Sequence, residues 1–359
     1  MKNIKRIIAL LLTFLFAFTG CKSNNGKEVT QERMMSQVMY ALILSDSGIN
    51  DNGINQYTWQ GILDLKAAGN IQTKYFEAEN EDEIKLNIEK AVASDYDVIF
   101  SLGDLANASL QKYKSSDPNQ LFAFINMDSK NQLDTNSFAV EFADYEGAFL
   151  AGYLACETTK TAKIAFLADV DNTSSQDSKY GFYAGAHYYN VLNSKNVQVF
   201  DKVIGSKSDS ALVKSNLASL YDDGCDTVFV NFDFAQQEML DTANEKNGKI
   251  IGAGYVDDTE KQENLIAKSV KYIGKGIKNI SDLYMKNEDI RGKTFVYGLK
   301  EGCIAFECDK SQIPLEIIDR IDAVKQKIIN GEIDVPAGYE EYQKYMAGSQ
   351  ASSSEITEE

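Results

Sequence analysis

The sequence predicts an α/β fold with two Rossmann-like lobes, each built on a parallel sheet, and a ligand cleft between them. Short apolar runs alternate with amphipathic segments along most of the chain, which is the pattern of parallel strands connected by helices. The alternation pauses after residue 142 and restarts at residue 164. About 300 residues of such units also exceed what a single core usually holds, which favours two lobes.

Residues 1–20 have the features of a secretory signal peptide. Three basic residues precede an apolar run of about 12 residues, and Gly20 stands directly before Cys21. A helix needs roughly 20 apolar residues to span a bilayer, so this segment is too short for a permanent anchor and predicts cleavage. The small residue before Cys21 is typical of a lipobox, which predicts a palmitate-bearing lipoprotein at the extracytoplasmic face of the cell membrane. An unlipidated secreted protein is the alternative.

The segments that flank the folded body are polar, and the whole chain is acidic. Residues 21–38 predict a flexible tether, and the Ser/Glu run at residues 347–359 predicts a disordered tail. Removing the leader leaves 33 Lys and Arg against 53 Asp and Glu, a formal charge of −20 in place of −17. Such a surface repels polyanions and argues against nucleic acid or lipid headgroups as partners. The lipid on Cys21 would therefore provide the membrane contact.

The first lobe is predicted over residues 39–143. Its helical segments carry apolar residues three or four positions apart, as in the series Ile84, Ile88 and Val92. The helix after the first strand is expected at residues 55–68. The strands are expected at residues 39–44, 71–76, 98–102, 121–125 and 138–142.

The second lobe is predicted over residues 144–255, and it begins with a helix at residues 146–156. The following chain is divided between the lobes: residues from about 256 to 290 are assigned to the first, and residues from about 291 to 336 to the second. The strands of the second lobe are expected at residues 164–167, 197–203, 227–230 and 250–251.

The loops that follow the strands are the expected place for a ligand. In open parallel sheets, ligands bind beyond the carboxyl ends of the strands, where loops deliver polar groups and helix N-termini deliver N–H donors. With two lobes facing each other, these loops would meet across the cleft. They lie at residues 46–55, 103–104, 126, 169–180, 231–234 and 254–257.

Several short motifs, taken in their order and spacing, resemble the basic membrane protein family. These lipoproteins bind nucleosides for ABC transporters and have the type I periplasmic-binding-protein fold. The strongest motifs are residues 46–51, which read Asp-Ser-Gly-Ile-Asn-Asp, and residues 146–155, which read Glu-Gly-Ala-Phe-Leu-Ala-Gly-Tyr-Leu-Ala. Supporting motifs are Asn-Gln at 55–56, Trp-Gln-Gly at 59–61, Gly-Phe-Tyr-Ala-Gly at 181–185, Leu-Tyr-Asp-Asp-Gly-Cys-Asp at 220–226, Ile-Ile-Gly at 250–252, Lys271, Gly331 and Val-Pro at 335–336.

The resemblance implies a set of polar ligand contacts. From the loop of the first lobe, Asp46, Asn50, Asp51 and Asn55 would grip the base and the sugar. Asp104 and Asn126 would come from later strand ends of that lobe, and Lys271 from the start of a helix after the second lobe. A purely structural alternative is that Asp51 and Asn55 cap the following helix, since Asp and Asn favour that position.

The pocket departs from the family's usual residues at several positions. Ile54 stands where the family usually has a Phe that can stack on a nucleobase, and Asn126 stands in place of Asp. At Gly254 a carboxylate that could accept ribose hydroxyls is absent, and residues 231–234 replace a Gly-rich strand end. A nucleoside, with a purine favoured, and another small polar ligand such as a sugar both stay open.

Aromatic rings near the strand ends of the second lobe could supply the missing stacking surface, which contributes roughly 1–3 kcal/mol per base. Phe232 and Phe234 alternate along the chain, so only one of them is expected to face the cleft. Trp59 fits a core position equally well. The other aromatic candidates are Tyr180, Phe182 and Tyr255.

No pattern in the sequence predicts catalysis, a metal or a cofactor. His187 is the single histidine, and no Gly-x-Ser-x-Gly elbow accompanies it. The Cys303–Cys308 spacing fits no zinc knuckle, and a disulfide between the two stays open. Asp169, Asp171 and Asp177 lack the Glu that closes a calcium loop, and a Walker motif is absent. Any ATPase would therefore be another subunit.

These observations predict a lipid-anchored solute-binding protein that delivers a nucleoside or similar small polar ligand to the permease and ATPase subunits of an ABC importer. One alternative is a ligand-presenting receptor that signals through a partner. The other is an extracytoplasmic hydrolase of the same ligands, although the sequence offers no recognisable acid/base pair for it.

Overall fold

The computed structural model describes residues 38–44, 48–50, 54–67, 69, 71–127, 133–232, 234–254 and 262–355. The folded unit comprises Val38–Glu359. The predicted signal peptide, Cys21 and the tether lie outside the described residues, except that Val38 begins the first strand. Within the described part of the chain, no helix is long and apolar enough to cross a membrane.

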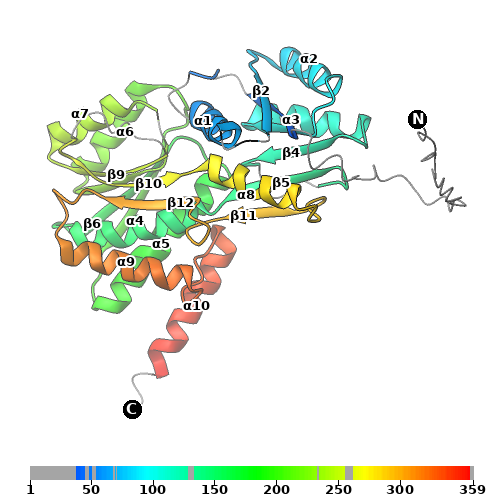
Figure 1. The fold of residues 1–359 in the computed structure, drawn as a ribbon. Helices are drawn as coiled ribbons and strands as arrows, with labels where there is room; N and C mark the ends of the chain where they lie inside the picture. The colour runs from blue at the N-terminus through cyan, green and yellow to red at the C-terminus, as the bar shows by residue number, and fades with distance from the viewer. Residues whose placement is uncertain are drawn as a thin grey trace, which may run out of the picture. The chain divides into compact units, whose positions relative to one another are not determined.

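The first sheet is parallel and has the strand order β11-β5-β4-β3-β1-β2. Figure 1 labels β2, β4, β5 and β11 of this sheet. Its central strands are buried along their whole length, as expected where helices cover both faces of a sheet. The strands are β1 (Val38–Leu44), β2 (Ile71–Phe76), β3 (Val98–Leu102), β4 (Leu121–Ile125), β5 (Ser137–Phe142) and β11 (Thr294–Tyr297). The helices between them are α1 (Ile54–Ala67), α2 (Glu81–Val92) and α3 (Asp104–Tyr113), followed by the 3-10 turn η2 (Lys114–Ser116).

The second sheet has the order β12-β10-β9-β8-β6-β7, and only β12 runs antiparallel to its neighbour. Its strands are β6 (Lys163–Ala168), β7 (Gln198–Val203), β8 (Thr227–Val230), β9 (Lys249–Ala253), β10 (Leu265–Lys271) and β12 (Ile304–Cys308). The remaining helices are α4 (Asp144–Thr158), α5 (Thr173–Asn193), α6 (Ser210–Asp222), α7 (Gln236–Lys246), α8 (Ile273–Met285), α9 (Leu315–Ile329) and α10 (Gly338–Glu355).

The strand pairing divides the end of the chain differently from the sequence-based assignment. β10 pairs with β9 of the second sheet, although residues 256–290 were expected in the first lobe. β11 pairs with β5 of the first sheet, although residues 291–336 were expected in the second. The apolar pattern of a strand shows that it is buried, but it does not say which of two similar sheets the strand joins.

Glycines bring α4 and α5 into backbone contact, which explains two of the motifs in the sequence. A Cβ on Gly152 would lie 2.1 Å from the carbonyl oxygen of Phe182, and a Cβ on Gly185 would lie 1.9 Å from that of Phe149. Because no side chain fits at these points, the two helices approach more closely than usual. Residues 147–156 of α4 are consequently all buried.

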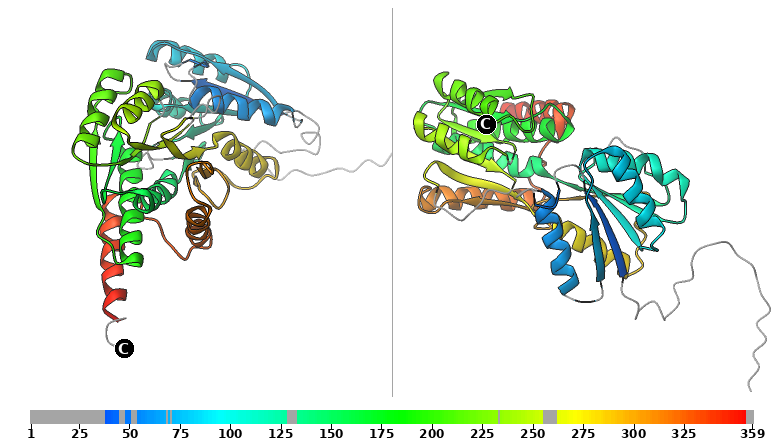
Figure 2. Two further views of the ribbon diagram at one scale, coloured as in Figure 1. Left: turned by 90° about the vertical axis from the view of Figure 1, so that its left-hand side faces the viewer. Right: turned by 90° about the horizontal axis from the view of Figure 1, so that it is seen from above.

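The predicted disordered tail is largely helical. α10 runs from Gly338 to Glu355, and residues 356–359 lie outside the described part. Its first half packs against α5 (Figure 2), where the ring of Tyr342 contacts that of Tyr180 and the ring of Tyr345 contacts that of His187. Tertiary packing stabilises the first half of α10, and the helix continues from there into the Ser-rich segment.

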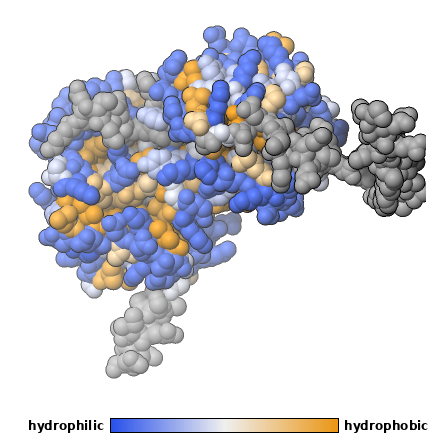
Figure 3. All heavy atoms as spheres, viewed as in Figure 1, coloured by the Kyte–Doolittle hydropathy of each residue, from blue (hydrophilic) through white to orange (hydrophobic). Residues whose placement is uncertain are grey.

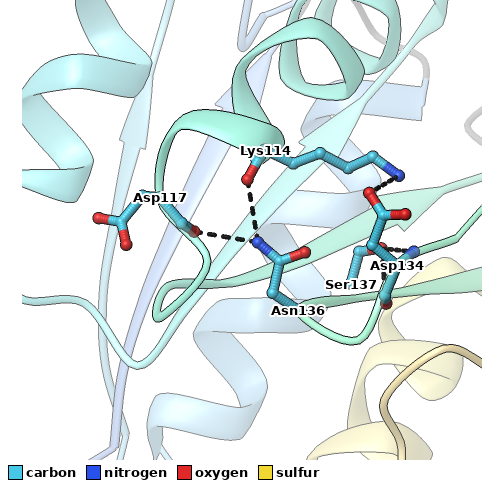
Figure 4. Close-up of polar contacts among 5 residues, drawn as sticks. All are labelled: Lys114, Asp117, Asp134, Asn136 and Ser137. Atoms are coloured by element: carbon cyan, nitrogen blue, oxygen red, sulfur yellow. Dashed lines mark hydrogen bonds and ion pairs between the residues drawn. The ribbon is translucent and has the colours of Figure 1, made fainter.

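A network of polar groups fixes the amino-terminal ends of β4 and β5 (Figure 4). Lys114 is almost fully buried, and its Nζ lies 2.9 Å from Oδ2 of Asp134. Nδ2 of Asn136 donates to the carbonyl oxygens of Lys114 and Asp117, each at 3.0 Å. The Asp134 amide donates to Oγ of Ser137. We call these five residues the amino-edge network.

Candidate ligand-binding site

Three residues at strand ends and a helix start connect the two sheets at their carboxyl-terminal edges. Lys271 is the last residue of β10 in the second sheet, and Asn126 directly follows β4 in the first. Nζ of Lys271 lies 3.3 Å from Oδ1 of Asn126 and forms an ion pair with Asp144 at the start of α4. We call Asn126, Asp144 and Lys271 the carboxyl-edge network.

The local backbone fixes the position of Asn126. Its φ of 53° is left-handed, a conformation that Asn tolerates better than most residues. Its amide donates to the carbonyl oxygen of Val140 at 2.8 Å. The ammonium of Lys271 also lies 5.7 Å from the ring centroid of Phe142. Asn126 and Lys271, both predicted as site residues, are therefore brought together, and Lys271 stands two residues before α8 begins.

Asp144 is the member of this network that the sequence did not predict. The side chains of Lys271 and Asp144 are only 16% and 22% exposed, so their ion pair is partly removed from water. A carboxylate in the first turn of a helix is also favoured by the helix dipole. The available signal was its position two residues before the Glu-Gly motif, at the start of a helix.

A second contact between the sheets involves Asp104, which begins α3 after β3. Nζ of Lys207, in the loop after β7, lies 2.9 Å from its Oδ2. Asp169 follows β6, and burial raises its pKa, whereas its bond from the Val170 amide and the charge of Lys207 act in the opposite direction. Asp104 thus meets a lysine of the second lobe that the sequence did not single out.

The described part of the loop before α1 is held by Asn55. This residue is fully buried and lies one position inside the helix, and its Nδ2 donates to the carbonyl oxygen of Gly48 at 2.9 Å. The bond fastens the loop onto the helix, so Asn55 is not the N-cap residue of the structural alternative. Asn50 is exposed, and Ile54 packs against the core. Asp46, Asp51 and Tyr255 lie outside the described residues.

Two of the aromatic candidates do not lie at strand ends. Phe182 is fully buried on α5 and stacks on Phe229 at 5.7 Å between ring centroids. Tyr180 also lies on α5, where it packs against Tyr339 and Tyr342 of α10. Both expectations were wrong because the segment predicted as a loop at residues 169–180 becomes helical from Thr173, after an Asn172 capping box.

The other two aromatic candidates follow β8 as expected. Phe232 is 8% exposed and Phe234 is half-buried, and their ring centroids are 4.8 Å apart. Both rings pack against the core of the second lobe. Phe234 is therefore the more accessible of the two.

The four cysteines after Cys21 are free thiols, and the single histidine packs against α10. Cys303 and Cys308 are free, and burial raises the pKa of each thiol to about 11. Cys156 and Cys225 are also free and buried. Burial lowers the pKa of His187, which lies on α5 and whose ring contacts Tyr345 of α10. Among the described residues, no group of three or more His, Cys, Asp or Glu side chains is placed to hold a metal ion.

Two α/β sheets, between which the described part of the chain crosses three times, define the type I periplasmic-binding-protein fold. A solute-binding protein of an ABC transporter system from Aeropyrum pernix superimposes with a TM-score of 0.71 at 19% identity, covering 87% of this chain and 98% of that one. A transcriptional activator of the comK gene from Bacillus halodurans gives 0.68 at 17% identity, covering 81% and 97%. These likenesses show the fold alone.

The family is shown by the sequence. Residues 38–338 match the family described as ABC transporter substrate-binding protein PnrA-like, and the chain belongs to it. Basic membrane protein A of Borreliella afzelii is 28% identical over 92% of this chain and 99% of its own length. The ABC transporter nucleoside-binding protein BmpA of Lactococcus lactis is 25% identical over 94% and 99%. The protein is therefore a substrate-binding component of an ABC transporter and not an enzyme.

Proposed function

We propose that this protein is a lipid-anchored, extracytoplasmic solute-binding protein that captures a nucleoside, with purine nucleosides first, and delivers it to an ABC permease. Membership of the PnrA-like family supports the transport role. The relative from Lactococcus lactis, named as nucleoside-binding, supports the ligand class. The lipobox supports the anchor on Cys21, and the acidic charge of −17 leaves the lipid as the membrane contact. Hydrophilic residues cover most of the face drawn in Figure 3.

The observation that carries the proposal is the carboxyl-edge network. A nucleoside is neutral and rich in hydroxyl groups, and each polar group buried without a partner costs about 1–3 kcal/mol. Lys271 offers up to three N–H donors, while Asn126 and Asp144 offer oxygen acceptors. Because Lys271 belongs to one sheet and Asn126 to the other, a ligand hydroxyl bound here would touch both lobes at once.

The remaining ligand contacts in this proposal combine the family resemblance with the aromatic candidates of the second lobe. Asp46, Asn50 and Asp51 would approach the ligand from the loop before α1, and Asn55 would hold that loop through Gly48. Phe234 and Tyr255 of the second lobe are the aromatic candidates for stacking on the base. Asp104 would act through its ion pair with Lys207 rather than directly.

A thermal-shift screen tests the ligand class. Purine and pyrimidine nucleosides, free bases and simple sugars are compared at equal concentration, and a nucleoside at 100 times its Kd stabilises the fold by about 2.7 kcal/mol. A shift with sugars and none with any nucleoside would refute nucleoside binding. Palmitate labelling of the protein and of Cys21→Ser tests the anchor separately, because only the native chain should incorporate label.

A further inference from the structure

The chain passes between the two sheets at three described segments, which we call the crossings. The first is residues 142–146, between β5 and the first turn of α4. The second is residues 271–275, between β10 and α8, and the third is residues 297–304, between β11 and β12. Any motion of one lobe against the other must be absorbed here, because the lobes are joined covalently at these points.

The three crossings are bonded to one another in pairs. The Ala143 amide of the first donates to the carbonyl oxygen of Tyr297 in the third, at 3.0 Å. The Tyr272 amide of the second donates to the carbonyl oxygen of Cys303 in the third, at 2.8 Å. Lys271 of the second pairs with Asp144 of the first.

Glu146 makes the remaining link between the first and third crossings with its side chain. Its Oε2 accepts a hydrogen bond of 2.6 Å from the Leu299 amide. The contact is tight, since a Cβ on Gly298 would lie 2.2 Å from the same oxygen. Glu301 caps the same turn by accepting from the Gly298 amide at 2.9 Å. The Glu146 carboxylate is thus held against the backbone of the third crossing.

The residue after Glu146 packs against β10, the strand that leads into the second crossing. A Cβ on Gly147 would lie 2.0 Å from Oγ of Ser269 in β10, so the start of α4 fits against that strand only without a side chain. The Glu-Gly pair of the motif therefore touches the third crossing and the strand that precedes the second, Glu146 through a hydrogen bond and Gly147 through close packing. Burial raises the pKa of Glu146, which the Leu299 amide counteracts.

We infer that Glu146 is a positioning residue for ligand binding, which holds the third crossing against the first and so limits the orientations that the two lobes adopt. The inference rests on the proposed capture of a ligand between the lobes. A protein that samples more lobe orientations spends a smaller fraction of time in the binding-competent one, and its apparent affinity falls by that fraction. Glu146 would act on affinity without touching the ligand.

Three substitutions of Glu146 separate the effect of its side-chain length from the effect of its charge. Glu146→Gln keeps an oxygen acceptor at the same reach, Glu146→Asp keeps the charge but is one methylene shorter, and Glu146→Ala removes both. Adenosine binding is measured by calorimetry for each. We expect Glu146→Gln to bind within about twofold of the native protein, and the other two to bind about five- to tenfold more weakly, as for loss of one hydrogen bond. Native affinity in Glu146→Ala would overturn the inference.

Asn136→Ala is the control for destabilisation. It weakens the amino-edge network, which lies at the opposite end of β5 from the first crossing, and should lower the melting temperature while leaving adenosine affinity unchanged. A similar loss of affinity in this variant would show that the effect of Glu146→Ala is general destabilisation, which would also overturn the inference.

A double-mutant cycle provides a pairwise test. Gly298→Ala places a methyl group against the Glu146 carboxylate and should weaken adenosine binding in the native background. In the Glu146→Ala background the same change meets no carboxylate and should add little. Additive effects of the two substitutions would contradict a direct link between these positions.

Hydrogen exchange decides the inference even if adenosine fails to bind the native protein, an outcome that would count against the proposed function. Glu146→Ala should accelerate exchange of the Leu299 amide about tenfold or more, and Glu146→Gln should not. Spin labels at the exposed positions Leu86 of α2 and Leu192 of α5 should show a broader distance distribution in Glu146→Ala. An unchanged exchange rate of the Leu299 amide, or an unchanged distance distribution, would refute the positioning role of Glu146.

Discussion

The same three residue types form a polar network at each edge of the first sheet, and the two networks differ in what they connect. The amino-edge network joins Lys114, Asp134 and Asn136, which all lie within one lobe and close together in sequence. The carboxyl-edge network joins Asn126, Asp144 and Lys271, and it connects the two sheets.

The difference indicates that the amino edge stabilises the fold and that the carboxyl edge is available to a ligand. Asn136 has both of its amide donor bonds directed at backbone carbonyls, and Lys114 is almost fully buried. Such a network stabilises the fold and offers little to a ligand. Lys271 contacts the side chains of Asn126 and Asp144, and a hydroxyl group could replace these contacts when a ligand binds. Matched substitutions at the two edges test this contrast.

The largest effect is expected for Asn136→Asp. This change places a carboxylate against the carbonyl oxygens of Lys114 and Asp117, and it should lower the free energy of unfolding by about 4 kcal/mol at pH 7. The pKa of the new carboxyl would be raised above its unfolded value, so the loss should shrink as the pH falls toward 4. Urea unfolding at the two pH values measures it. Equal destabilisation at both would contradict this account.

Lys271→Met should weaken binding of a nucleoside about 100-fold, because Asp144 and the ligand hydroxyls lose their shared donor. The free energy of unfolding should change by less than about 1 kcal/mol, since removing this lysine leaves no fully buried charge. Calorimetry and urea unfolding on one preparation separate the two effects. A large loss of stability with unchanged affinity would make the two edges equivalent.

Asn126→Asp is the counterpart of Asn136→Asp and should be tolerated. Lys271 stands 3.3 Å from the side-chain oxygen of Asn126, so a carboxylate there gains a partner. We expect a change in unfolding free energy below about 1 kcal/mol and ribonucleoside affinity raised about threefold to tenfold. Affinity for 2′-deoxynucleosides should rise less if ribose hydroxyls are the target, and a loss of affinity for both would argue against this site.

The smallest effect is expected for Asp104→Asn, which removes the ion pair between Asp104 and Lys207. Both side chains are more than half exposed, so the pair should contribute less than about 1 kcal/mol to ligand affinity. The salt dependence is more informative: affinity should weaken between low and high ionic strength in the native protein and much less in the variant. Identical salt dependence would exclude Lys207 as a contact between the lobes during binding.

Much of the fold could be predicted from local pattern. β3, β4 and β8 begin and end at the predicted residues, because each is buried along its whole length and consists mainly of apolar residues. β2 also has the predicted bounds, although it is an edge strand with polar residues inside it. The prediction of a disordered tail was wrong for residues 347–355, which continue a helix whose first half packs against α5. A local pattern does not reveal such a distant partner. The assignment of β10 to the first lobe and of β11 to the second was wrong, because the apolar pattern of a strand suits either sheet.

The candidate site could be predicted only in part. Asn126 and Lys271 were expected from the resemblance and do contact each other. Asp144 was missed, because its only signal is a place at a helix start, and acidic residues are common there. Phe182 was expected at a strand end because it follows a polar segment, but that segment is helical and the ring is buried.

By itself, the sequence determined the class of fold, the family and the set of side chains that could meet a small polar ligand. Alternation of apolar runs and amphipathic segments is a local property, and so is a motif. Only the tertiary structure decided that Lys271 reaches Asn126 and Asp144, and that Glu146 holds the turn at Leu299. These contacts join residues more than a hundred positions apart, or elements of different sheets, so they depend on which sheet each strand enters.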